Sequence, residues 1–140
     1  MIMLASIKSY LEQQGVTGDI RLGSMPDQPD NCIALFEYAG GPPDLHWPGE
    51  YPGLQVRVRD ISYPAGRANI EEVMQMLHGL HEQTLGGARY LLFKARGSPE
   101  VLKRDASDRV EFIVNFDVVK ERAKTSESNS DNENNNKERE

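Results

Sequence analysis

A strict alternation of apolar and polar residues at positions 54–60 constrains the fold of this chain most. The alternating residues are Leu54, Gln55, Val56, Arg57, Val58 and Arg59. A period of two is typical of a strand with one buried and one wet face, so we expect a central strand here. Residues 31–38 predict a second strand with two mostly apolar faces, which favours a position inside a sheet.

Two helices are predicted to flank this sheet. Residues 1–14 carry an apolar stripe at helical spacing, formed by Ile2, Met3, Ile7, Tyr10 and Leu11. Residues from Pro64 to about His81 carry a longer one, formed by Ile70, Val73, Met74, Leu77 and Leu80.

Further strands are expected at residues 18–23, 89–95 and 110–119, the last being the longest run of period two. The predicted fold class is therefore α+β, with an antiparallel or mixed sheet of about four to five strands and two main helices. Residues 1–120 are expected to form one domain. Residues 121–140 are rich in Ser, Asn, Glu and Lys and are predicted to be a disordered polar tail.

Prolines set the region before the central strand apart. Six of the eight prolines lie between positions 26 and 52. Proline donates no main-chain hydrogen bond, so residues 25–31 are predicted to form a stiff loop and residues 39–53 to form long loops beside the sheet. Trp47 and Tyr51 lie in the second region and have the composition of interface anchors. Both rings folding back over the sheet is the alternative.

Arg57 and Arg59 are two further candidate contact residues. They project from the same strand face and could bind carboxylates of a neighbouring subunit bidentately. Partners within the same chain would give a solvated sheet face instead, and the sequence leaves both possibilities open.

The composition argues against several classes of protein. The net charge is −6, with no block of basic residues, so direct nucleic-acid recognition is not expected. No apolar run reaches the length of a membrane helix, and the single cysteine fits a reducing, intracellular compartment.

Nucleotide-binding, zinc and other cofactor motifs are not found, so we expect no cofactor and no metal. His78 and His81 could share a helix face, but a structural role is favoured over a metal site. The alternative that remains is a small cation- or ligand-binding domain or hydrolase, with Asp27, Asp30 and Asp60 in its loops. Asx residues beside proline are, however, common turn formers.

Three strings resemble a phage minor capsid protein family, thought to act as tail terminator or tail completion proteins of long-tailed phages. They are MPDQPDN at residues 25–31, QVRVRD at residues 55–60 and RVEFIVNF at residues 109–116. The resemblance spans roughly residues 1–120. It implies a non-enzymatic virion protein at the head-tail junction that assembles into a ring, a hexamer.

The resemblance also implies partners: further copies of the chain, the tail tube protein, and the head-tail connector or stopper protein. In this setting Trp47, Tyr51, Arg57 and Arg59 are expected at subunit or partner contacts. No catalytic residues are implied.

Overall fold

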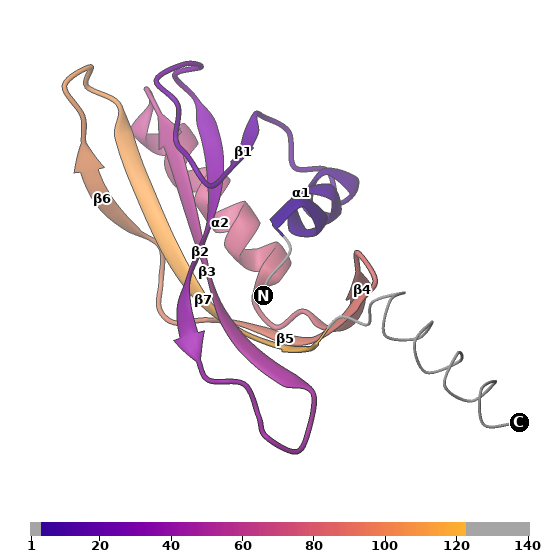
Figure 1. Cartoon of the computed structure of the whole chain (residues 1–140). Coiled ribbons are helices and arrows are strands. Elements are labelled where there is room, and N and C mark those ends of the chain that lie inside the picture. Colours follow the sequence, from indigo (N-terminus) through magenta and orange to yellow (C-terminus); the bar gives the residue numbers. More distant parts are fainter. Residues whose placement is uncertain (1–3, 123–140) are drawn as a thin grey trace, which may run out of the picture.

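The computed structural model describes residues 4–122, which form one curled sheet with two helices on one side (Figure 1). The helices are α1 (Leu4–Gln13) and α2 (Tyr63–Leu77). The strands are β1 (Ile20–Leu22), β2 (Cys32–Gly41), β3 (Gly49–Asp60), β4 (His81–Leu85), β5 (Ala88–Ala95), β6 (Glu100–Arg104) and β7 (Val110–Glu121). Both helices confirm the α+β class. Ile2, Met3 and residues 123–140 lie outside the described residues.

The sheet is mixed and has the order β1-β2-β3-β7-β5-β4, with β6 also paired to β7. Only β1 and β2 run parallel, and the remaining pairs are antiparallel. The apolar residues of β3 behave as expected, because Leu54, Val56 and Val58 are each at most 1% exposed in the core beneath the helices. The opposite face is less wet than predicted, since Arg59 is only 4% exposed. The central position of β3, between β2 and β7, is also confirmed.

The expectation of four to five strands was too low. The long helix is predicted to run to about His81, but α2 ends at Leu77 because His78 is extended and Gly79 has a φ of +83°, and His81 begins β4. Leu80 still packs on the core, from the loop that follows. The short strands β4 and β6 have largely exposed side chains, so neither carries the apolar alternation that predicts a strand.

The prediction of long loops over residues 39–53 was wrong. Strand β2 continues to Gly41 and β3 begins at Gly49, so a long hairpin replaces most of the expected loop. A register shift between Tyr38 and Gly41 accommodates Pro52, which donates no main-chain hydrogen bond. A Cβ at Gly40 would lie 1.8 Å from the carbonyl oxygen of Tyr51, so glycine is required there.

The start of α2 joins β3 to the helix layer. The Ser62 hydroxyl accepts from the Ala65 N–H at 3.3 Å, and Asp60 Oδ1 accepts from the Ser62 N–H at 2.8 Å. Pro64 occupies the first turn, where the missing N–H costs nothing. In the described part of the chain, no helix is both long and apolar enough to cross a membrane.

Candidate functional site

Two proline-rich loops lie at opposite ends of β2 and form the candidate site. Residues 25–31 precede β2 and lie at the same end of the sheet as the β6–β7 turn (Figure 1). Residues 42–48 follow β2 at the tip of the hairpin, which projects past the sheet at the other end (Figure 1). The two loops are held in different ways.

Arg59 binds the loop of residues 25–31 through its main chain. The arginine is 4% exposed, and its guanidinium donates to four carbonyl oxygens. These acceptors belong to Pro26, Asp27, Pro29 and Asp30, with Nε to Asp30 O at 3.0 Å and Nη2 to Pro29 O at 2.8 Å. Prolines remove donors from this loop, and Arg59 satisfies the acceptors that remain. The hydrogen-bond acceptors of Arg59 in this structure therefore belong to its own chain.

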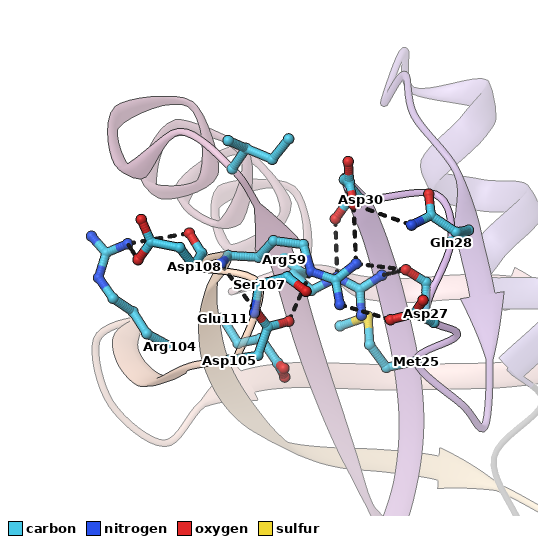
Figure 2. A network of polar contacts seen from close by, with 12 residues as sticks. Met25, Asp27, Gln28, Asp30, Arg59, Arg104, Asp105, Ser107, Asp108 and Glu111 are labelled. Carbon is cyan, nitrogen blue, oxygen red and sulfur yellow. Dashed lines mark hydrogen bonds and ion pairs between the residues drawn. The ribbon is translucent and has the colours of Figure 1, made fainter.

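Arg109 binds the side chains of the same loop. It lies one residue before β7, is 5% exposed, and contacts three carboxylates. The distances are 3.0 Å from Nη2 to Asp27, 3.1 Å from Nη1 to Asp30 and 2.8 Å from Nε to Asp105. Figure 2 shows Asp27 and Asp30 converging with Asp105 from the β6–β7 turn. A single guanidinium thus joins two loops that are about 80 residues apart in sequence.

The charges of this network stabilise each other. The Arg109 main-chain N–H holds the pKa of Asp105 below its ordinary value, against the opposing effect of burial, and the Arg109 guanidinium adds to this. Burial alone would lower the pKa of Arg109, but its hydrogen bonds to Asp27 and Asp105 raise it. Asp27 and Asp30 therefore serve as partners of an arginine.

The structure brings only two of the three aspartates of the alternative prediction into this network. Asp60 is 4% exposed and accepts from Ser62 N–H at the start of α2. Among the residues that the structure describes, no group of three or more His, Cys, Asp or Glu side chains could hold a metal ion. His78 Nδ1 accepts from the Ala95 N–H at 2.9 Å, and His81 contacts the Gly79 carbonyl. These two histidines fix main-chain segments.

Arg57 lies two residues before Arg59 on the helix-free face of β3, but its surroundings differ. Its guanidinium carbon lies 4.9 Å from the centre of the Phe36 ring, and Nε donates to Gln55 at 2.7 Å. Gln55 in turn donates to Asn115 on β7 at 3.1 Å. Arg57 is half-buried, so part of it stays accessible to another molecule.

The tip of the β2–β3 hairpin is ordered by main-chain and side-chain contacts. Asp44 N–H donates to Gly49 O at 3.1 Å, and the Tyr51 hydroxyl donates to the Asp44 carboxylate, which raises the pKa of Tyr51. The Trp47 ring occupies the space a Cβ at Gly49 would need. Trp47 and Tyr51 thus pack on their own hairpin.

The same tip exposes large apolar surface. Leu45 is 93% exposed and Trp47 is 38% exposed. A depression of about 540 Å³ is lined there by residues 43–47. An apolar tip that is held rigidly is suited to contact another protein, because little conformational entropy remains to be lost on binding.

Sequence reasoning did not single out Arg109 or Leu45. The spacing of Asp105 and Arg109 indicates a local ion pair at most, and nothing in it places Asp27 nearby. Leu45 is one apolar residue in a polar, proline-rich stretch and belongs to no period. Leu45 is exposed because the hairpin is long. The proline content of this stretch predicted loops in place of a hairpin.

The chain matches the family model described as "Bacteriophage tail terminator protein" over residues 10–122. The fold is similar to that of a chain in the solved structure entitled "Virion of native gene transfer agent (GTA) particle", with a TM-score of 0.62. The two sequences are 15% identical, and the match covers 86% of this chain and 95% of that chain. A sequence comparison with curated proteins gives no match.

Proposed function

Because this chain belongs to the bacteriophage tail terminator protein family, we propose that its copies form a closed ring, a hexamer, that caps the tail tube. In this proposal the ring also meets the head-tail connector or stopper protein. The family match over residues 10–122 carries the proposal. The chain is a structural protein of the phage tail and is located in the virion.

The structure supports a role in docking through its two loops. Both ends of β2 carry a loop that is rigid, one through Arg59 and Arg109 and the other through its own hairpin contacts. Rigid loops on a sheet scaffold lose little freedom on binding and are common sites of partner contact. We therefore propose that the protein acts by association and not by catalysis.

Four residues are assigned to these contacts. Trp47 and Tyr51 build the apolar hairpin tip, and Arg57 presents a half-buried guanidinium on the helix-free face. Arg59 acts through the loop of residues 25–31, whose carbonyl oxygens it binds. The first three would touch the partner, whereas Arg59 would position a loop that does.

Negative-stain imaging of the purified chain tests this proposal, alone and mixed with tail tubes from a phage mutant that lacks it. We expect rings in solution, or density capping one end of each tube, and class averages that give the symmetry. Monomers that leave both tube ends bare would contradict the proposal. The same mixture with Trp47→Ala should show fewer capped tubes while the subunit still folds.

A further inference from the structure

Most edges of the sheet are protected against pairing with another strand. The Phe93 end of β5 is covered by residues 78–80, with Gly79 N–H to Phe93 O at 2.8 Å and Phe93 N–H to Leu80 O at 2.9 Å. Strand β4 lies against α1 and is kinked at Glu82, whose φ is +51°. Strand β1 has only three residues. Kinks, covers and short length are how proteins prevent unwanted strand pairing.

Two edges in the described part of the chain lack such protection. Strand β1 pairs with β2 only at residues 33–35, so the outer edge of residues 36–41 has no partner strand. Strand β6 pairs with β7 on one side only, and all five of its residues are exposed. Val101 and Leu102 are 46% and 41% exposed, and large apolar residues on an open edge are unusual in a protein that stays monomeric.

We propose that the open edge of β6 pairs with residues 36–41 of β2 in a second copy of this chain, so that the sheet continues from subunit to subunit. This inference rests on the proposed ring and names its lateral contact. The two edges lie on opposite sides of the sheet, so the contact is heterologous, and a heterologous contact closes into a ring when its rotation fits.

Strand directions favour this pairing. Strands β2, β3, β7 and β6 alternate in direction, because each neighbouring pair is antiparallel. In a ring whose axis runs roughly along the strands, every copy keeps the same strand directions. Strand β6 of one copy therefore meets β2 of the next antiparallel, which is the more stable ladder.

The heights of the two edges along the strands indicate that the strands must tilt relative to the axis of a closed ring. Strand β6 pairs with residues 110–113 of β7. The open part of β2 begins at Phe36, which pairs with Gln55 of β3, and Gln55 pairs in turn with Asn115 of β7. The edges are thus staggered along the sheet. Closing a sheet on itself requires tilted strands and a stagger of this kind.

Side chains on the two edges are complementary in an antiparallel arrangement. The basic end of β6, Lys103 and Arg104, comes opposite the start of the open segment, which carries Glu37. Lys103 and Arg104 also pair with Glu111 and Asp108 of their own chain, but both basic side chains are more than half exposed. Glu37 is exposed and has no ion-pair partner within residues 4–122. The apolar pair Val101 and Leu102 comes opposite residues 38–40, where Tyr38 is half-buried.

A proline at position 37 tests the pairing selectively. Ile33 N–H donates to Asp19 O, and Leu35 O accepts from Gly23 N–H, so odd-numbered residues of β2 turn their main-chain groups away from β3. Glu37 continues this alternation, and Glu37→Pro removes an outward N–H without breaking the β2–β3 ladder. Glu37→Ala is the matched control, because it removes the carboxylate and keeps the N–H.

We expect the wild-type chain and Glu37→Ala to form rings or cap tubes, and Glu37→Pro to need at least about tenfold more protein to do so. Circular dichroism should give all three chains the same folded spectrum. Rings of Glu37→Pro at wild-type concentration would overturn the edge pairing and leave the proposed function standing. A wild-type chain that neither forms rings nor caps tubes would overturn both.

A cross-linking variant gives an answer even if Glu37→Pro fails to fold. Ala39→Cys combined with Leu102→Cys places one thiol on each edge, and the native Cys32 is only 3% exposed. A short bis-maleimide should then link copies into a covalent series up to the closed ring. Each single-cysteine variant should stop at traces of dimer. A double variant that behaves like the single ones would overturn the pairing.

Discussion

The loops before and after β2 have similar composition but opposite construction. Residues 25–31 contain two prolines and turn their carbonyl oxygens inward, toward the buried Arg59. Asp27 and Asp30 pair with the buried Arg109, although their side chains stay 84% and 43% exposed. Residues 42–48 contain three prolines and turn Leu45 outward. The first loop is fixed by buried charge, and the second is fixed by a hairpin that exposes apolar surface. Proline content therefore indicates stiffness, while the residues around a loop decide what it exposes.

The largest change in stability is expected from Arg109→Ala. It leaves the carboxylates of Asp27, Asp30 and Asp105 without their shared cation and frees the β6–β7 turn from the loop of residues 25–31. The measurement is the melting temperature by circular dichroism. The fall should be several times that of Arg104→Ala, since Arg104 is half-exposed and pairs with the exposed Asp108. Equal effects of the two substitutions would mean that the network does not anchor the loop.

A second prediction separates the two arginines of β3. Arg59→Met should destabilise the fold by about 2–4 kcal/mol, because four carbonyl acceptors lose a buried charged donor. Arg57→Met should cost about 1 kcal/mol or less, since Arg57 is half-buried and its Phe36 contact survives in apolar form. Urea denaturation measures both values.

The direct effects of these two substitutions on assembly should have the reverse order of their effects on stability. Arg57→Met should reduce tube capping at unchanged subunit stability if Arg57 touches a partner. Any assembly defect of Arg59→Met should follow its loss of stability and disappear under conditions in which the variant is fully folded. A stable Arg59→Met chain that still fails to assemble would instead favour a direct partner contact for Arg59.

The sequence predicted the elements whose burial follows a period. The alternating apolar residues of β3 and β7, the stripe Ile70, Val73 and Leu77 of α2, and Ile7 and Leu11 of α1 are all buried as expected. Local turn chemistry likewise predicted the loop of residues 25–31. Each of these features depends on residues close together in sequence.

Features that depend on distant residues could not be predicted in this way. Arg109 meets Asp27 because β7 and the start of β2 reach the same end of the sheet, and no local pattern encodes that meeting. Strand β6 has no apolar alternation, because all five of its residues are exposed, and only its pairing with the distant β7 makes it a strand. The hairpin of residues 32–60 contradicts local proline content because a register shift and Gly40 accommodate the prolines.

A third prediction concerns pH and the Arg109 network. Because the folded-state pKa of Asp105 lies below its ordinary value of 3.8, the stability it contributes is present above that value. This contribution is lost as the pH falls through the lowered pKa. Asp105→Asn should therefore flatten the acid side of the stability curve below about pH 4. Chemical denaturation at a series of pH values measures the slope, with Asp108→Asn as the control on an exposed side chain of the same turn. Parallel curves for the wild type and Asp105→Asn would contradict the prediction.

The smallest effect on stability is expected at the hairpin tip. Leu45 is 93% exposed, so Leu45→Ser should change the free energy of unfolding by no more than about 0.5 kcal/mol. If the tip binds a partner, the same substitution should still lower the fraction of capped tubes, because an exposed apolar anchor acts only when it is covered. Leu22→Ser is the matched control, since Leu22 is also an exposed leucine but lies on β1, at the opposite end of β2 from the hairpin tip. Equal capping by both variants would leave the loop of residues 25–31 as the stronger candidate for partner contact, and the exposed tip as surface without a binding role.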